Sequence, residues 1–257
     1  MILVIGDTQI KPGVNIDHIA AVGNLIVKER PETIVIIGDW WDFPSLSFFA
    51  KGKAEIEGKR LHDDIESGFH ALAIMFKPWL DLVEKQRNQK MKMYNPRVVF
   101  TEGNHEHRLY RFMEDNPNMQ GMFDIRKPLK DMGIEYHNFR EVVEIDNILF
   151  SHFFSNPMSG RPWGGSIINK LVKIGHSFVQ GHTQVFEYTE RHISNGEFQF
   201  GVTMGAFYSH EEDYKGPQGN RHFRGVLKIH NAESRKDIEV LSIERLLGDY
   251  FDEKQSA

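Results

Sequence analysis

Acidic, amide and imidazole side chains follow directly on five short apolar runs of the sequence. The polar segments are Gly6-Asp7-Thr8-Gln9, Gly38-Asp39-Trp40-Trp41-Asp42, Glu102-Gly103-Asn104-His105-Glu106, Ser151-His152 and Gly181-His182-Thr183-Gln184. Oxygen and imidazole ligands together suit divalent cations such as Zn²⁺, Mn²⁺, Fe or Ni²⁺. Carboxylates can also bridge two cations about 3.5–4 Å apart, an arrangement that activates water and stabilises phosphoryl charge. The segments therefore point to a metal centre suited to phosphoester hydrolysis.

Short strands would bring these segments together. We expect buried strands over residues 2–5, 33–37 and 97–101, and a helix over 16–28 whose apolar residues recur with a helical period. A β-α-β unit of this kind gives parallel strands with a right-handed crossover. Because ligands of open α/β sheets bind beyond the carboxyl ends of the strands, the polar side chains should converge on one site. The convergent set is Asp7, Gln9, Asp39, Asn104, His105, His152, His182 and Gln184.

The second half of the chain is richer in strands than the first. A helix over 61–82, with Pro78 as a kink or boundary, and a helix that begins within 107–114 complete the first half. Further short strands, separated by turn signals, are expected at 142–145, 148–151, 178–180, 185–191, 199–202, 226–230 and 238–241. No linker divides the two halves. We therefore expect a single α/β domain over residues 1–257, with a sheet-on-sheet core covered by helices.

Composition narrows the classes of function. Of the 257 residues, 40% are hydrophobic and 26% charged, which excludes a disordered tail protein. With 0 Cys, disulfides, thiolate zinc sites and cysteine nucleophiles are excluded. The net charge of -5 argues against a globally basic nucleic-acid binder. No apolar stretch reaches the about 20 residues that span a bilayer, and the N-terminus predicts a strand rather than a signal peptide, so we expect a cytoplasmic protein with no membrane partner.

In their order, the five segments resemble the motifs of the calcineurin-like metallophosphoesterases. The family pattern is Asp-x-His, Gly-Asp-x-x-Asp, Gly-Asn-His-Glu/Asp, a lone His and Gly-His-x-His, and here the motifs extend from Asp7 to Gln184. Two positions depart from the pattern, because Gln9 and Gln184 stand where the family usually has His. The resemblance implies a four-layer αββα sandwich of two mixed β-sheets flanked by helices.

The resemblance also implies a set of metal ligands. Asp39 would bridge two divalent ions, and the other ligands would divide between them. The first ion would take Asp7, Gln9 and Gln184, and the second Asn104, His152 and His182. Because an amide oxygen is a harder and weaker ligand than imidazole, we expect Mn²⁺ to be favoured, with Zn²⁺, Fe, Ni²⁺ and Mg²⁺ as alternatives.

Catalytic roles follow from the same resemblance. His105 would donate a proton to the leaving group or bind the phosphate, and it would not bind a metal ion. Asp42 would orient its ring, as carboxylates commonly orient catalytic imidazoles. Arg108 has two interpretations, a solvated residue in a first helical turn or a fork that pairs with phosphate oxygens.

Structural roles stay open for several of these residues. Asp7 and Asp39 could form turns or helix caps, and a lone histidine such as His152 is more often structural. His176 also follows a glycine but would lie at the opposite end of its strand. The Gly-rich, basic segment 215–224 is either an ordinary surface loop or a lid or substrate loop. Aromatic residues beside the motifs are interpreted mainly as loop packing, although exposed ones could stack a base; they are Trp40, Trp41, Phe43, Phe48, Phe49, Phe153, Phe154 and Trp163.

Together these features favour a metal-dependent phosphodiesterase or phosphatase that acts on a nucleotide or a nucleic-acid end. A metal-activated water would attack phosphorus while His105 assists the leaving oxygen. Phe43-Pro44 stands after Asp42 where Ser/Thr protein phosphatases have Arg-Gly, which argues against that class. Two alternatives stay open. One is a nuclease with a local basic groove, and the other is a catalytically weakened nucleotide- or protein-binding module. The groove would use Lys51, Lys53, Lys59 and Arg60. The sequence carries no signal for an oligomeric state.

Overall fold

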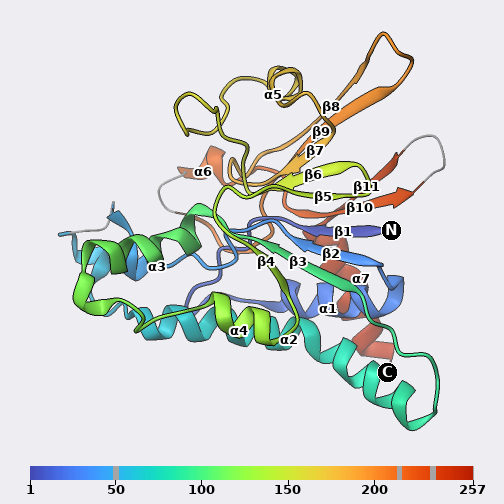
Figure 1. Cartoon of the computed structure of the whole chain (residues 1–257). Coiled ribbons are helices and arrows are strands. Elements are labelled where there is room, and N and C mark those ends of the chain that lie inside the picture. Colours follow the sequence, from blue (N-terminus) through green and yellow to red (C-terminus); the bar gives the residue numbers. More distant parts are fainter. Residues whose placement is uncertain (49–51, 213–215, 232–235, 257) are drawn as a thin grey trace.

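The computed structural model of the protein describes residues 1–48, 52–212, 216–231 and 236–256. Over these residues the chain forms two mixed β-sheets that pack against each other, with helices on their outer sides (Figure 1). This is the α/β sandwich that the sequence predicts.

The first sheet grows from the predicted β-α-β unit. Its strand order is β11 (Lys236–Ser242), β10 (Gly225–Asn231), β1 (Ile2–Ile5), β2 (Thr33–Ile36), β3 (Arg97–Thr101) and β4 (Glu135–His137). Strands β1 to β4 are parallel, whereas β10 is antiparallel to both β1 and β11. Both β1 and β2 are buried along their whole length, which explains their uninterrupted apolar sequences.

The second sheet takes its strands from the second half of the chain. Its order is β5 (Val143–Ile145), β6 (Ile148–Ser151), β7 (Phe178–Gln180), β9 (Phe198–Met204) and β8 (Phe186–His192). Its central strands β6, β7 and β9 are parallel, and both edge strands are antiparallel to their neighbours. The carboxyl ends of β6 and β7 therefore lie side by side, next to the residues that follow them.

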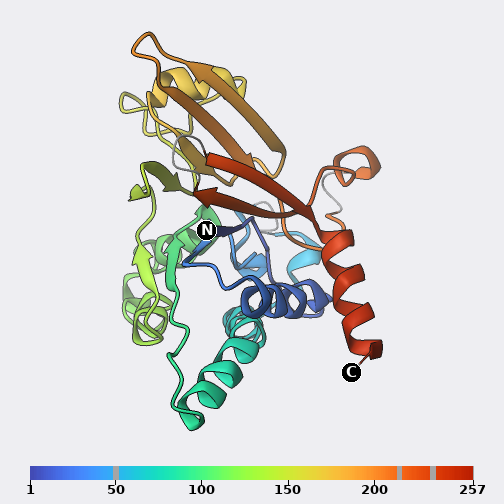
Figure 2. The same ribbon diagram turned by 90° about the vertical axis from the view of Figure 1, so that its right-hand side faces the viewer.

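Successive side chains of each strand point to opposite faces of its sheet, and this alternation divides the core into layers. Val4 and Val35 of the first sheet pack against Phe150 and Val202 of the second, whereas the neighbouring Leu3 faces the helices. Helices α1 (Asp17–Glu29), α2 (Leu61–Asn88) and α7 (Ile243–Ser256) cover the first sheet, with α1 in contact with both others (Figure 2). Helix α5 (Ile167–Ile174) packs on β8 and β9 of the second sheet. The layers are thus helix, sheet, sheet, helix.

Several elements differ from the sequence-based expectation. Helix α2 extends to Asn88 with Pro78 inside it, so the proline is not a boundary. Helix α3 (Asn104–Asp115) begins before residue 107. Strand β4 and the helices α4 (Arg126–Asp131), α5, α6 (Gly216–Gly219) and α7 were not predicted. Most of these are too short for a hydrophobic period to identify. Single 3₁₀ turns occur at Pro44–Leu46, Ala54–Ile56 and Pro117–Met119. No helix in the described ranges has the length and apolarity needed to cross a membrane.

Candidate metal centre

Strained backbone marks the segments that follow the strands. Four of the predicted ligands have a positive φ, a conformation that residues other than glycine rarely adopt. They are Gln9 at 44°, Asp39 at 49°, His182 at 73° and Gln184 at 56°. Such strain costs about 1–3 kcal/mol per residue and tends to gather at functional sites. Its concentration here supports a functional role for these turns and argues against ordinary Asp caps.

Three of the predicted ligands form one compact cluster. Donor atoms of Asp39, His152 and His182 all lie within 4.8 Å of one another. Asn104 joins them, because its Oδ1 accepts hydrogen bonds from His182 Nδ1 at 2.7 Å and His152 Nε2 at 3.1 Å. His152 Nε2 is also 3.4 Å from Asp39 Oδ1. The structure thus brings Asp39, the residue expected to bridge, together with all the residues expected at the second metal ion.

The chemistry of this cluster fits a cation. His152 Nδ1 donates to the carbonyl of Ile37 at 2.9 Å, the kind of backbone contact that orients a metal-binding imidazole. Burial disfavours its charge, but the carboxylate of Asp39 raises the pKa of His152 to about 10. A divalent cation would replace the proton that His152 Nε2 shares with Asp39 and Asn104, since metal binding displaces protons from its ligands. His152 therefore lies within the cluster, with its Nε2 directed at Asp39 and Asn104.

The other predicted ligands lie deeper beside the same strands. Asp7 has no exposed surface and accepts the backbone N–H of His182 at 3.1 Å. Burial raises the pKa of Asp7 to about 7, with the nearby charge of Asp39 adding to the effect. Burial acts on Asp39 too, but the charges of His105 and His152 hold its pKa below the usual value. Two buried carboxylates this close need positive charge between them, which a cation would supply.

The two glutamines differ in their surroundings. Gln9 is 1% exposed and its Nε2 has no hydrogen-bond partner. Since the amide oxygen and nitrogen exchange places on a half-turn, Gln9 could present its oxygen at this unpartnered position to a cation. Gln184 instead has Oε1 accepting the hydroxyl of Tyr208 at 3.1 Å. Of these two glutamines, only Gln9 thus has an amide nitrogen without a partner among the described residues, and a first ion bound by Asp7, Gln9 and Gln184 remains a prediction.

His105 stands beside the cluster and is held from three sides. Its Nδ1 lies 3.1 Å from Asp42 Oδ1, and its Nε2 accepts from Arg108 Nη2 at 2.8 Å. Its Nε2 is 3.8 Å from Asp39 Oδ2, outside the compact ligand cluster. Burial lowers the pKa of His105, but Asp39 and Asp42 outweigh it and raise the pKa. Through the Nδ1 contact, Asp42 can hold the ring in one orientation.

Glu106 was not among the site residues predicted from the sequence. Its buried carboxylate accepts three backbone N–H groups at 2.9 Å, those of Asp39, Trp41 and Gly103. It thereby joins the turn after β2 to the first turn of α3 and fixes Asp39 relative to Asn104. The available signal was the glutamate at the third helical position, which accepts the N–H of the N-cap residue Gly103 as the glutamate of a capping box does.

Lys11 lies beside Asp42 and contacts Glu212, a pairing that no pattern in the sequence indicated. Lys11 Nζ lies 3.2 Å from Asp42 Oδ2 and 2.7 Å from Glu212 Oε1. Burial opposes ionisation of Asp42, but the His105 hydrogen bond and the charge of Lys11 hold its pKa at about 2. The segment that follows β9 therefore reaches the centre twice, through Glu212 and through Tyr208.

The aromatic residues after β2 are core residues, which confirms the packing interpretation for them. Trp40, Trp41 and Phe43 are fully buried. A Cβ on Gly68 would lie 1.7 Å from Trp41 Nε1, so only glycine lets α2 approach this turn. Phe153 and Phe154 are buried as well, whereas Phe48 is 80% exposed. Phe49, Lys51 and residues 214–215 lie outside the described residues.

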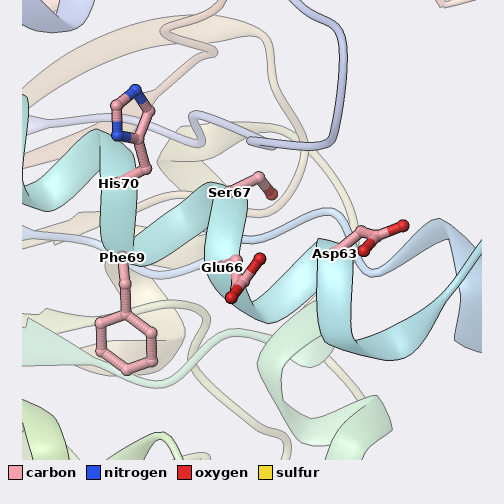
Figure 3. Close-up of a pocket in the computed structure, with 5 residues that line it drawn as sticks. All are labelled: Asp63, Glu66, Ser67, Phe69 and His70. Atoms are coloured by element: carbon pink, nitrogen blue, oxygen red, sulfur yellow. The ribbon is translucent and has the colours of Figure 1, made fainter.

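A surface hollow on α2 is unrelated to this centre. Its lining residues are Asp63, Glu66, Ser67, Phe69 and His70. Figure 3 shows Phe69 and His70 pointing to opposite sides of the helix. Because these side chains do not converge on a common point, the hollow is not arranged as a catalytic or metal-binding site. His176 also lies apart, before β7, as expected.

A sandwich of two mixed sheets with a candidate metal-binding cluster at its strand ends suits a metal-dependent hydrolase of phosphoester bonds. Residues 1–233 match the calcineurin-like phosphoesterase family, and the chain belongs to that family. No curated protein matches the chain. Helix α7 lies beyond the matched residues, yet its Ile243, Leu246 and Tyr250 are part of the core over the first sheet.

Proposed function

We propose that the protein is a phosphodiesterase or phosphatase acting on a nucleotide or a nucleic-acid end, with two divalent ions held by Asp7, Gln9, Asp39, Asn104, His152, His182 and Gln184. The observation that carries this proposal is the placement of His105, locked by Asp42 next to the ligand cluster. A module that only binds ligands would not need an imidazole oriented in this way. The exposed Phe48, six residues after Asp42, is a surface on which a base could stack.

The residues around His105 have separate roles in the proposed reaction. When bound, the cations would supply a water of lowered pKa and neutralise charge on the phosphoryl group. In the free protein Arg108 donates to His105 Nε2, so the ring carries its proton on Nδ1, toward Asp42. A bound phosphate would compete with Asp42 and His105 for the half-buried guanidinium. His105 Nε2 would then be free to take up a proton and donate it to the leaving oxygen.

A panel of substrates crossed with a panel of metals tests the proposal. The substrates are p-nitrophenyl phosphate, bis-p-nitrophenyl phosphate, cyclic nucleotides and short DNA, each with Mn²⁺, Zn²⁺, Ni²⁺ or Mg²⁺. We expect turnover with Mn²⁺ and a preference among the esters that separates monoesterase, diesterase and nuclease. If no phosphoester is turned over with any of these ions, the proposal is wrong.

Removal of metal by EDTA is expected to abolish activity while the protein stays folded. The strands of both sheets bury apolar residues on two faces, so the fold does not depend on the ions as a small zinc domain does. Loss of bound cations should lower the melting temperature by about 5–10 °C. Differential scanning calorimetry checks this, with re-addition of Mn²⁺ as the control. Unfolding of the metal-free protein at room temperature would contradict it.

The glutamines predict an asymmetric metal centre. The site of Asn104, His152 and His182 should fill first and survive dialysis, whereas the oxygen-rich site of Gln9 and Gln184 should lose its ion and refill with Mn²⁺. A Gln9→His, Gln184→His double variant should bind the first ion at least about tenfold more tightly and shift its preference toward Zn²⁺.

Calorimetric titration of both proteins measures these affinities. Gln89→His serves as the control, because Gln89 is exposed at the end of α2. Two equally tight sites in the natural protein, or unchanged affinity in the double variant, would speak against asymmetry.

A further inference from the structure

Lys11 lies between two acidic side chains at the edge of the metal centre. Its Nζ is 2.7 Å from Glu212 Oε1 and 3.2 Å from Asp42 Oδ2. The side chains of Lys11, Asp42 and Glu212 are 21%, 14% and 10% exposed, so water screens these contacts only partly. An ammonium group has three hydrogens to donate, and one lysine can therefore serve both carboxylates.

The carboxylate of Asp42 has a different partner on each oxygen. Oδ2 faces Lys11, whereas Oδ1 is 3.1 Å from His105 Nδ1. The guanidinium of Arg108 is on the side of Oδ1, with Nη1 3.9 Å away. The main-chain carbonyl of Asp42 lies 3.0 Å from the same Nδ1, so the ring has one neutral and one charged acceptor. By holding Oδ2, the ammonium group of Lys11 fixes the rotation that keeps the charged acceptor on His105.

Backbone pairing sets the position of Lys11 relative to Asp42. The N–H of Ile10 donates to the carbonyl of Trp40 at 2.8 Å, and the N–H of Asp42 donates to the carbonyl of Ile10 at 2.9 Å. The segment after β1 thus runs alongside the segment after β2, as a continuation of the parallel strand pair. Because Lys11 follows Ile10 directly, the first sheet itself brings the lysine to Asp42.

Glu212 is held in place by the segment that follows β9. Its N–H donates to Asn220 Oδ1 and its carbonyl accepts from Asn220 Nδ2, both at 2.9 Å. Arg224 Nη2 donates in turn to the carbonyl of Asn220 at 3.1 Å. His210 Nε2 lies 2.7 Å from the Glu212 oxygen that Lys11 contacts. The carboxylate of Glu212 is therefore a fixed anchor for the lysine on the side away from Asp42.

We propose that Lys11 and Glu212 are positioning residues for His105. Glu212 anchors the ammonium group of Lys11, the ammonium group holds the carboxylate of Asp42, and that carboxylate keeps the imidazole in its orientation. The proposal rests on the proposed phosphoester hydrolysis, in which His105 passes a proton from Nε2 to the leaving oxygen as the P–O bond breaks. The pair should accordingly matter most for esters whose leaving oxygen is basic and needs that proton.

The test compares phenyl with p-nitrophenyl esters, of whichever type, monoester or diester, the natural protein hydrolyses with Mn²⁺. Phenolate is the more basic leaving group and depends more on a donated proton. Lys11→Met should lower kcat about 10–100-fold for the phenyl ester and less than about threefold for the p-nitrophenyl ester, with KM within about twofold of the natural value. Lys11→Arg should keep most of the natural rate, because it retains a cation between the two carboxylates.

A second substitution tests the anchor. Glu212→Gln should show the same dependence on the leaving group in weaker form. The double variant Lys11→Met, Glu212→Gln should lose no more activity than Lys11→Met, since both changes act through one contact. It also removes a carboxylate that Lys11→Met leaves without its cation, which favours folding. Lys228→Met is the matched control, because Lys228 on β10 contacts two carboxylates, Glu29 and Glu239, each at 3.2 Å, and both rates should stay unchanged.

Nuclear magnetic resonance of protein labelled with ¹⁵N-histidine, without metal and with Zn²⁺, gives a readout that needs no turnover. The Nδ1 resonance of His105 reports the acceptor that it faces. Lys11→Met should move this resonance toward its position in Asp42→Asn, whereas Lys11→Arg and Lys228→Met should leave it in place. If the natural protein hydrolyses neither ester with any metal, the proposed function fails, but the resonance still decides on the positioning role.

Three results would overturn the proposal. They are equal losses of kcat for the two esters in Lys11→Met, a raised KM with an unchanged kcat, and a His105 resonance that stays at its natural position. The raised KM would assign Lys11 to the binding of substrate instead.

Discussion

Changing Asp39 to asparagine is expected to reduce phosphoester hydrolysis by at least about 10³-fold, more than any other single substitution. The carboxylate lies among the donor atoms of His152 and His182, and its Oδ1 also accepts the backbone N–H of His105 at 2.9 Å. Loss of its charge weakens the binding of both cations at once. It also removes the charge that keeps His152 basic.

Metal analysis of the same samples gives the second readout for this variant. Bound metal per chain should fall together with activity, and a circular dichroism melt should show that the protein remains folded. Asp81→Asn is the control, because Asp81 is an exposed carboxylate paired with Lys77 on α2. Full metal content together with near-normal turnover in Asp39→Asn would show that Asp39 does not bridge the ions.

His105→Ala is expected to lower turnover by about 10²–10⁴-fold without loss of metal. The ring lies beside the ligand cluster and not within it, with Nδ1 on Asp42 and Nε2 on Arg108. Its removal should therefore affect the proton transfer and leave the cations in place. Steady-state kinetics and metal analysis on one preparation measure both quantities.

Two further variants help to interpret the result for His105→Ala. His176→Ala should have no effect, because His176 precedes β7 and lies at the far end of that strand from the centre. Asp42→Asn should reproduce part of the loss by freeing the ring. If His105→Ala loses its metal, His105 is a ligand, and if it binds substrate normally and hydrolyses it at the natural rate, catalysis does not use this residue.

The position of the centre could be predicted from the sequence because the strands that lead into it are short, uninterrupted apolar runs. The runs ending at Ile5 and Thr101 are apolar and short, and each is followed by a turn and a polar residue. Parallel order then places those residues at one edge, which is where the structure has them. The residue types also suggest a division between metal ligands and the neighbouring His105, which metal analysis of His105→Ala would test.

Contacts that hold the ligands in place could not be predicted, because they join segments far apart in the chain. Glu106 reaches Trp41 across 65 positions, and Lys11 reaches Glu212 across 201. No local period reports such pairings. Short elements were missed for a related reason, since the three residues of β4 and the eight of α5 are ordered by tertiary packing more than by their own sequence pattern.

Titration of metal-free protein with Mn²⁺, followed by the rate of bis-p-nitrophenyl phosphate hydrolysis and by bound Mn²⁺ per chain, tests the central claim most directly. The claim is that the strand-end residues around Asp39 form a metal centre that hydrolyses phosphoesters. We expect no turnover without metal, a rate that rises as the weaker of two sites fills, and neither binding nor turnover of comparable size in Asp39→Asn. Turnover that persists without metal, or bound Mn²⁺ without turnover of this or any other phosphoester, would contradict the claim.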